Sequence, residues 1–564
     1  MGRRVKRKMK GEAMRHGGQI LVDALKIQGV GRVFSVPGES FLAALDGLHG
    51  SGIDNVVCRQ EGAAAMMAEA HGKLANRPGV LFVTRGPGAA NAAAGIHVAM
   101  HDSTPMVVFV GQIARGHRDR SAFQEVDFRA FFAPLAKWVA EVDDTRRLPE
   151  YISRAFHMAM SGRPGPVVLA LPEDMLSAEA DVPDLPAPAP APAAVAPAQV
   201  AAVMQALEAA RKPLVVAGGP LWTARASADL ARFAEVQGLP VALAFRRQDY
   251  MNNRHRSYVG DLSVGMRPDL KAALAEADTL LILGSRFGDV ASGGYAVDPG
   301  APGKTILHVH PDPDELGRVF RPDLAVAAPA PDMLAALAAE NGPGRADWAE
   351  WRTRLRAGYE AWLKPVETPG AVKLENVVAE LGRRLPEGSV IANGAGNYNM
   401  WLHRYHQFSQ PKSYLGATSG SMGYGFPAAI AAALETGRPS VAWTGDGCFQ
   451  MTLNELSTAV QHGAPVIAIV ANNGRYGTIR MHQERSYPGR VSGTDLANPD
   501  FAALARSYGA HGETVETDAG FAPAFERALA SGKPAVIDLV LDPEALTTSQ
   551  TLSEVRGQAA GPGL

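Results

Sequence analysis

The sequence has 564 residues, which at roughly 150 residues per domain is enough for three or four domains with cores of their own. Lys and Arg number 55 and Asp and Glu 57, so the net charge of −2 disfavours nucleic acid as a partner. Two cysteines, Cys58 and Cys448, exclude a disulfide framework and a thiolate zinc site, and a reducing cytoplasm is expected. The apolar runs are far shorter than the roughly 20 residues of a membrane span, so no membrane association is expected.

The chain begins with a basic segment, residues 1–13, in which six Lys and Arg residues crowd positions 3–10. No apolar stretch follows it, so we expect a disordered extension rather than a signal peptide. Periodic sequence starts near Met14 and predicts a first domain over residues 14–180.

Two breaks divide the remaining chain. In residues 181–199, Pro and Ala supply 13 of 19 positions, which predicts an extended linker. A second linker is expected at 341–370, where Gly and Pro flank a polar helical stretch with three tryptophans. The central domain is therefore expected at 200–340 and the third at 371–545, followed by a C-terminal tail at 546–564.

Short β-branched runs alternate with Ala-rich helical stretches in all three domains. This alternation predicts an α/β protein with three doubly wound parallel sheets, joined by right-handed connections. The predicted strands are residues 80–83, 106–110, 214–216, 280–283, 306–309, 441–443 and 466–470.

The first and third domains share a spacing. A strand ends at Gly86-Pro87-Gly88 and the next opens at Pro105; another ends at Gly445-Asp446-Gly447 and the next opens at Pro465. The offsets from the first glycine to the proline are 19 and 20 residues. Two related domains that offer their strand ends to one ligand would have this pattern, although any two βαβ units resemble each other.

The residues at the third domain's strand ends favour a magnesium site. Asp446 ends one strand, and Asn472 and Asn473 end the next, with a helix near 453–461 long enough to place the two strands side by side. These oxygens, a backbone carbonyl and substrate phosphates would complete the octahedron that Mg²⁺ prefers. The glycines on either side of Asp446 would let phosphates approach the backbone.

Two other sites are disfavoured. A nicotinamide fingerprint at Gly86-Pro87-Gly88 would need a third glycine where Asn91 stands, and an acid at the end of the next strand, which reads Val110-Gly111-Gln112. His97 and His101 have the spacing of helical zinc ligands, but no third ligand suggests itself.

Taken together, these motifs resemble the thiamine-diphosphate-dependent enzymes, and within them the acetolactate synthase large-subunit branch. The resemblance covers about residues 17–543. It is carried by the stretch from Gly445-Asp446-Gly447-Cys448 to Asn472-Asn473 and by Arg59-Gln60-Glu61, Gly86-Pro87-Gly88, Ala122-Phe123-Gln124-Glu125, Met400-Trp401 and Gly420-Ser421-Met422-Gly423.

The resemblance implies pyrimidine-binding, central and diphosphate-binding domains and a role for each motif. Glu61 would activate the cofactor through its pyrimidine ring, and Met422 would support the bent cofactor from below. Phe123, Gln124 and Lys137 would line the substrate approach, although the phenylalanine could instead be a core aromatic and the lysine a surface residue.

The resemblance also implies a set of cofactor and metal contacts. Mg²⁺ would be held by Asp446, Asn473 and the backbone carbonyl of Arg475. Cys448 follows the metal turn and is expected to be a packed residue rather than a nucleophile. The cofactor contacts would be Gly86, Gly396, Asn397, Asn399, Gly420, Met422, Gly445, Asp446, Gly447, Cys448 and Asn473.

The expected activity is decarboxylation and carboligation of a 2-oxo acid such as pyruvate. The active protein would be a homodimer or homotetramer with sites at the subunit interface. Segments 286–290 and 308–312 keep half of the acidic pattern that accompanies flavin in biosynthetic acetolactate synthases, so FAD is left open. The loop at 36–40 also departs from the family. An acyloin or aldehyde lyase, an oxalyl-CoA-type decarboxylase and a non-catalytic cofactor-binding protein are the alternatives.

Overall fold

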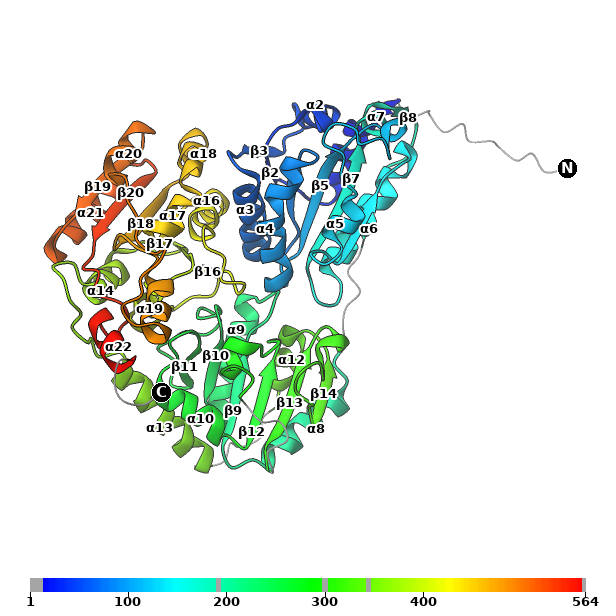
Figure 1. Cartoon of the computed structure of the whole chain (residues 1–564). Helices are drawn as coiled ribbons and strands as arrows, with labels where there is room; N and C mark the ends of the chain where they lie inside the picture. Colours follow the sequence, from blue (N-terminus) through cyan, green and yellow to red (C-terminus); the bar gives the residue numbers. More distant parts are fainter. Residues whose placement is uncertain (1–13, 189–193, 297–302, 341–345, 560–564) are drawn as a thin grey trace. The chain divides into compact units, whose positions relative to one another are not determined.

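A computed structural model describes residues 14–188, 194–296, 303–340 and 346–559 (Figure 1). The chain divides into two compact units. Unit 1 contains residues up to Gly72, Arg77–Met100 and Pro105–Ala191; unit 2 contains Lys73–Asn76, His101–Thr104 and the chain from Pro192 onward. The short segments at 73–76 and 101–104 contain the last residues of two helices that begin in unit 1. The predicted basic extension lies outside the described residues.

Unit 1 is built on a parallel sheet with strand order β3-β2-β4-β5-β7-β6. Helices α3 and α4 cover one face and α6 the other (Figure 1), so β4 and β5 are buried along their whole length. The strands are β1 (Arg15–His16), β2 (Arg32–Ser35), β3 (Asp54–Val57), β4 (Gly79–Val83), β5 (Met106–Gln112), β6 (Trp138–Glu141), β7 (Pro166–Pro172) and β8 (Glu179–Ala180). The helices are α1 (Gly17–Ile27), α2 (Leu42–Leu48), α3 (Glu61–Ala75), α4 (Pro87–Asp102), α5 (Phe128–Phe132), α6 (Leu148–Met160) and α7 (Glu173–Ser177).

The first sheet of unit 2 has the order β11-β10-β9-β12-β13-β14 and is also parallel. Its strands are β9 (Pro213–Ala217), β10 (Val241–Ala244), β11 (Tyr258–Leu262), β12 (Thr279–Leu283), β13 (Thr305–His310) and β14 (Leu324–Ala327). Its helices are α8 (Pro197–Glu208), α9 (Ala224–Gln237), α10 (Pro268–Glu276), α11 (Asp289–Ser292), α12 (Ala330–Leu337) and α13 (Ala346–Trp362).

The second sheet of unit 2 has the order β16-β15-β17-β18-β20-β19, again parallel, with α21 on one face and α16 on the other (Figure 1). Its strands are β15 (Ile391–Asn393), β16 (Tyr414–Gly416), β17 (Ser440–Gly445), β18 (Val466–Asn472), β19 (His511–Val515) and β20 (Ala535–Val540). Its helices are α14 (Leu374–Arg384), α15 (Asn399–Tyr405), α16 (Gly425–Thr436), α17 (Asp446–Gln450), α18 (Leu456–Gln461), α19 (Gly477–Ser486), α20 (Phe501–Ser507), α21 (Asp518–Ala530) and α22 (Leu552–Ala559).

All seven predicted strands lie within strands of the structure, and the three parallel sheets confirm the predicted fold class. The segment expected as a second linker differs. Most of it is α13, whose Trp348 and Trp351 are buried and donate their indole N–H groups to the carbonyls of Ala210 and Pro213. Tryptophans that cover apolar area and satisfy backbone groups make this segment part of the core of unit 2.

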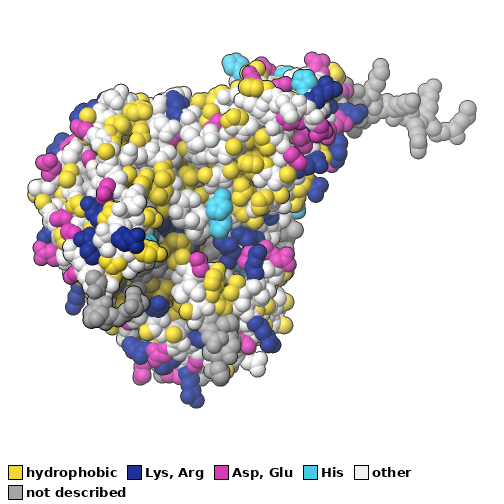
Figure 2. Space-filling model, in the orientation of Figure 1, with side chains coloured by type: hydrophobic (Ala, Val, Ile, Leu, Met, Phe, Trp, Pro, Cys, Tyr) yellow, Lys and Arg dark blue, Asp and Glu magenta, His cyan; other side chains and the backbone are white. Residues whose placement is uncertain are grey.

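The distribution of charged side chains on the surface is consistent with the net charge of −2. Basic and acidic side chains are interspersed over the face shown in Figure 2.

Both cysteines are buried free thiols. None of the helices in the described ranges has the length and apolar character needed to cross a bilayer. The cytoplasmic location stays a prediction.

Candidate active site

The second sheet of unit 2 has a topological switch point between β15 and β17. The chain leaves β15 towards β16 on one side and leaves β17 towards β18 on the other. Gly445 lies opposite Ala471 in the β17–β18 register, so Asp446 and Asn472 follow at the same edge of the sheet. A cavity of about 240 Å³ opens there, at the carboxyl ends of the strands where ligands bind in folds of this kind.

The cavity brings together most of the predicted cofactor and metal residues. Asn399 is an exception, because its Nδ2 donates to the carbonyl of Gly394 at 2.8 Å and it is not part of the lining. Cys448 is packed as expected, and its Sγ accepts a hydrogen bond from the Gly423 N–H at 3.1 Å. The predicted residues that line the cavity are Gly396, Asn397, Gly420, Met422, Gly445, Asp446, Gly447, Cys448, Asn473 and Arg475.

Two tyrosine rings explain why glycine flanks Asp446. A Cβ on Gly445 would lie 2.7 Å from the ring of Tyr398, and one on Gly447 would lie 2.5 Å from the ring of Tyr476. Both tyrosines line the cavity, and the sequence motifs did not identify either of them. The glycines therefore let the turn between β17 and α17 sit against two aromatic walls.

Asp446 is a buried carboxylate surrounded by neutral donors. Its Oδ1 accepts from the Gly447 N–H at 2.8 Å, and its Oδ2 accepts from the Gly474 N–H at 2.9 Å and from Asn498 Nδ2 at 2.8 Å. Burial raises the pKa of Asp446 despite these bonds. Among the described residues no Lys or Arg pairs with it, so a divalent cation would be its natural counter-charge.

The donor set at this carboxylate fits Mg²⁺ rather than a softer metal. Asn473 and Arg475 border the same cavity, and the Asn473 amide and the Arg475 carbonyl would add two hard oxygens. No cluster of three or more His, Cys, Asp or Glu side chains occurs in the described part of the chain. The site would thus rely on one acid, amide and carbonyl oxygens, and phosphate from a bound ligand.

Asn498 is a site residue that the sequence did not indicate. Its Nδ2 donates at 2.8 Å both to Asp446 and to Asn472 Oδ1, while Asn472 donates to Asp538 at 3.0 Å. Asn472 therefore supports the site from behind and Asn473 faces the cavity. Because Asn498 lies in a loop far along the chain, no local pattern marks it.

Asn397 is fixed by helix α19. Its N–H donates to Thr478 Oγ1 at 3.0 Å, and that hydroxyl donates to Asn397 Oδ1 at 2.9 Å. Its Nδ2 donates to the carbonyl of Leu546 at 3.2 Å, so the first residue of the predicted C-terminal tail lies at the cavity, and helix α22 (Leu552–Ala559) follows it.

In unit 1, Glu61 is the first residue of α3 and lies beside the 86–88 turn. Its Oε2 accepts from Asn91 Nδ2 at 2.9 Å, and a Cβ on Gly88 would lie 3.2 Å from its Oε1. Gly86 has φ +55°, and a Cβ there would lie 2.8 Å from the Cβ of Gln124. The turn is thus in contact with two predicted catalytic residues.

Glu125 holds the loop that carries Phe123 and Gln124. Its carboxylate accepts from the N–H groups of Asp119 and Ala122 at 2.7 and 2.8 Å, and these backbone bonds lower its pKa. The Phe123 side chain is 73% exposed and Gln124 has φ +64°. An ordered loop that presents a bare aromatic side chain suits a substrate contact better than a core aromatic.

Comparison with known proteins places this geometry in a family. Three domain families match: the "Thiamine pyrophosphate enzyme" N-terminal TPP binding domain at residues 15–131, the central domain at 200–337 and the C-terminal TPP binding domain at 394–539. The chain belongs to the thiamine pyrophosphate enzyme family. It is an acetolactate synthase-like enzyme that depends on thiamine pyrophosphate (thiamine diphosphate).

The relatives cover nearly the whole chain. The acetolactate synthase large subunit of Corynebacterium glutamicum is 32% identical over 558 residues, covering 94% of this chain and 87% of that protein. Acetolactate synthase isozyme 2 large subunit of Escherichia coli is 30% identical over 534 residues, with 93% and 96% coverage. The probable acetolactate synthase large subunit of Methanocaldococcus jannaschii is 31% identical, with 94% and 93% coverage.

One residue that the family resemblance suggested has a structural task in this thiamine pyrophosphate enzyme. Lys137 Nζ donates to the carbonyls of Met158 and Ser161, both at 2.6 Å, at the C-terminal end of α6. A lysine that binds the last carbonyls of a helix stabilises that helix end. A contact of Lys137 with the substrate stays a prediction.

The segments at 286–290 and 308–312, whose pattern left FAD open, make hydrogen bonds and core contacts within the protein. Arg286 donates to the carbonyl of His101 at 2.8 Å, His308 is bonded to the Ser285 carbonyl at 2.9 Å, and Asp312 accepts from the Asp314 N–H at 3.0 Å. Phe287 is buried in the core. Binding of FAD stays a prediction.

Proposed function

We propose that this protein is a Mg²⁺- and thiamine-diphosphate-dependent carboligase that decarboxylates a 2-oxo acid, most simply pyruvate, and joins the remaining fragment to a second carbonyl compound. The observation that carries the proposal is the single cavity that gathers Asp446, Asn473 and Met422 at the switch point of the second sheet of unit 2. The likeness to acetolactate synthase large subunits over more than nine-tenths of the chain supports the choice of substrate class.

The residues of the cavity would hold the cofactor's diphosphate through the metal. Asp446 supplies the anionic oxygen, and Asn473 and the Arg475 carbonyl supply neutral ones. Asn498 keeps the Asp446 carboxylate oriented. Met422, a large and adaptable side chain in the lining, would fill the space beneath the cofactor.

Bound thiamine diphosphate supplies an acidic thiazolium carbon and an electron sink for breaking and making bonds next to a carbonyl. Glu61 would hold and move the proton that this activation requires. Asn91 donates to Glu61 and so orients the carboxylate while leaving its Oε1 for the ligand. Phe123 and Gln124 would contact the substrate from the loop held by Glu125.

We also propose that the active form is a homodimer or homotetramer in which Glu61 of one copy serves the cofactor held by Asp446 of another. The carboxylate and the metal residues belong to different units of the chain, which makes a shared site between copies possible.

The central experiment combines binding and product analysis. The purified protein is stripped of cofactor, and its melting temperature is measured with Mg²⁺, with thiamine diphosphate and with both; a ligand at 100 times its Kd adds about 2.7 kcal/mol. The loaded enzyme is then given pyruvate alone, and CO₂ and acetolactate are measured.

We expect stabilisation only when both ligands are present, and acetolactate with CO₂ from pyruvate. Stabilisation without turnover of any 2-oxo acid, combined with cleavage of acyloins such as benzoin, would replace the proposal with an aldehyde lyase. Stabilisation with no turnover of either class would indicate a non-catalytic binding protein. No stabilisation would refute the cofactor assignment itself.

A further inference from the structure

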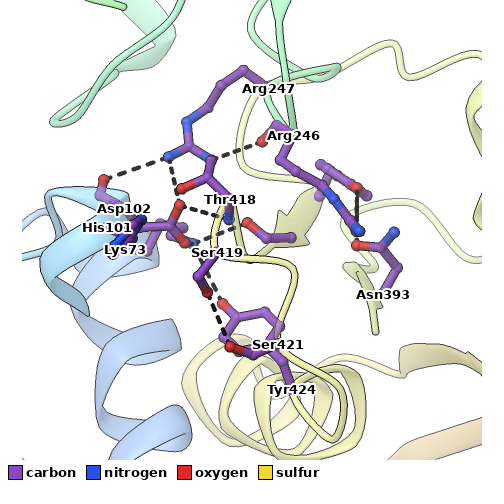
Figure 3. A network of polar contacts seen from close by, with 12 residues as sticks. Lys73, His101, Asp102, Arg246, Arg247, Asn393, Thr418, Ser419, Ser421 and Tyr424 are labelled. Carbon is purple, nitrogen blue, oxygen red and sulfur yellow. Dashed lines mark hydrogen bonds and ion pairs between the residues drawn. The ribbon is translucent and has the colours of Figure 1, made fainter. Parts of the chain in front are cut away.

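A buried charge cluster lies in unit 2, where the ends of α3 and α4 come close to Arg247, which follows β10, and to Thr418, which follows β16 (Figure 3). Asp102 Oδ2 accepts from Lys73 Nζ at 2.6 Å, and its Oδ1 accepts from Arg247 Nη2 at 3.2 Å. Burial alone would raise the pKa of Asp102, but the two cations outweigh it and hold the pKa below its usual value. Asp102 is therefore a buried anion that pairs with two cations, Lys73 and Arg247.

The cluster also binds both ends of the segment between β16 and α16. Asp102 Oδ1 accepts from the Thr418 N–H at 2.9 Å, near the start of this segment. Lys73 Nζ donates to the Gly416 carbonyl at 3.3 Å and to the Tyr424 hydroxyl at 3.4 Å, at the start and the end of the segment. One ion pair thus closes a loop of nine residues, 416–424.

This loop forms one wall of the cofactor cavity. Gly420 and Met422 line the cavity, whereas the side chains at 418–422 are only partly buried or exposed. Inside the loop, Ser419 and Ser421 share a hydrogen bond of 3.0 Å. With little packing of its own, the middle of the loop depends on its ends for a defined position.

We infer that Lys73 and Asp102 are positioning residues that fix the 416–424 loop in the conformation that accepts the cofactor. The inference rests on the proposed function, because it concerns binding of thiamine diphosphate at the same cavity. When the binding-competent conformation is only partly populated, the apparent Kd is the intrinsic Kd divided by that population. Loss of the anchor therefore weakens cofactor binding without removing any group that touches the cofactor.

The test compares two identical substitutions at different lysines. Lys73→Met removes the contacts to Gly416, Tyr424 and Asp102 and leaves Asp102 paired with the cation of Arg247. Lys304→Met is the control, because Lys304 is also partly buried and donates to the carbonyls of Leu274 and Ala275 at 3.2 and 3.1 Å, in the region of α10.

Two quantities are measured on each full-length variant and on the wild type. Hydrogen exchange of peptides that cover 416–424 is followed in the cofactor-free protein. The Kd of thiamine diphosphate with saturating Mg²⁺ is determined by calorimetry. For Lys73→Met we expect faster exchange in the loop and a Kd raised about tenfold, as when the competent population falls from nearly all molecules to about one in ten.

The outcomes separate the two levels of the hypothesis. Wild-type protein that does not bind thiamine diphosphate contradicts the proposed function. Wild-type binding with unchanged loop exchange and Kd in Lys73→Met overturns the positioning role, and so does an equal loss in Lys304→Met. If Lys73→Met does not fold, Asp102→Asn, which keeps the shape and an acceptor for Thr418, is measured in the same way, and wild-type values in that variant also overturn the inference.

Discussion

Asp446 shows how one residue's surroundings indicate its chemistry. Its carboxylate is buried and accepts three hydrogen bonds, all from uncharged N–H groups. A buried anion is costly unless it gains an opposite charge. The raised pKa of Asp446 expresses this cost, and a bound divalent cation would remove it.

Replacing Asp446 with alanine should abolish retention of thiamine diphosphate, because the diphosphate would lose its metal bridge. Retention is measured by assaying the cofactor that remains after desalting in Mg²⁺ buffer. The matched control is Asp332→Ala, which removes a carboxyl from the first turn of α12, outside the cavity lining, and should leave retention intact. Tight retention in Asp446→Ala would falsify the metal assignment.

Glu61→Gln should separate activation from binding. The amide keeps the size of the side chain but cannot take up a proton, so cofactor affinity should persist while turnover falls by roughly 10² or more, as general acid–base catalysis allows. Steady-state rates and calorimetry on the same preparation provide the two numbers. Turnover close to that of the wild type would remove Glu61 from the mechanism.

The buried carboxyl group of Asp249 should make the folding stability of the protein depend on pH. Burial raises its pKa to about 6, although its Oδ2 accepts from the N–H groups of Ser413 and Tyr414 at 3.1 and 3.3 Å. The ordinary value is 3.8, so the folded protein binds this proton more tightly than the unfolded chain does. The stability that the protonated form provides is complete below pH 4 and is lost as the pH rises through 6.

Asp249→Asn should remove that loss. The melting temperature of the variant minus that of the wild type should therefore rise between pH 4 and pH 6.5 and then level off. Differential scanning fluorimetry across this range provides the measurement. A difference that stays constant with pH would show that Asp249 does not titrate in this window.

At the scale of elements, helix α22 packs against helix α19, whose first residues line the cavity, and the two are also joined by an ion pair. Leu546, Leu552 and Val555 form a small buried cluster with Met481 of α19. Glu484 of α19 accepts from Arg556 of α22 at 2.7 and 2.8 Å and from Arg480 at 2.9 Å. Two helices that are distant in sequence are thus joined by apolar packing and by one carboxylate.

Arg556→Met should weaken the contact between these two helices. We expect the free energy of unfolding to fall by about 1–2 kcal/mol. This value lies between the contribution of a surface ion pair and that of a hydrogen bond to a buried charge. The melting temperature should fall, and hydrogen exchange should increase in α22 and in the C-terminal half of α19. An unchanged exchange pattern would mean that the apolar cluster alone holds the two helices together.

At the scale of the whole molecule, the proposed sharing of sites between copies predicts complementation. Glu61→Gln and Asp446→Ala should each be nearly inactive. Co-expressed as differently tagged chains that pair at random, they should recover about one quarter of wild-type activity, because half of the dimers are mixed and each mixed dimer has one intact site. No recovery in an isolated mixed oligomer would place both residues in a site within one chain.

The sequence alone determined the architecture and the site's composition. Strands such as β4 and β18 are apolar runs of parallel-sheet length, and Asp446 and Asn473 lie at the ends of neighbouring strands. Strand ends of a parallel sheet meet at one edge, so local patterns were sufficient to predict that these residues gather in one place.

Only the tertiary structure decided how the site is supported. Asn498 donates a hydrogen bond to Asp446 from a distant loop. Lys73 and Asp102 bind the 416–424 loop from helix ends that lie more than 300 residues earlier in the chain. The Lys137 side chain binds carbonyls at the end of α6. The tryptophans of α13 likewise fill a core rather than a linker. Contacts of this kind depend on which groups remain unsatisfied once the sheets pack together, and no local spacing along the chain encodes that.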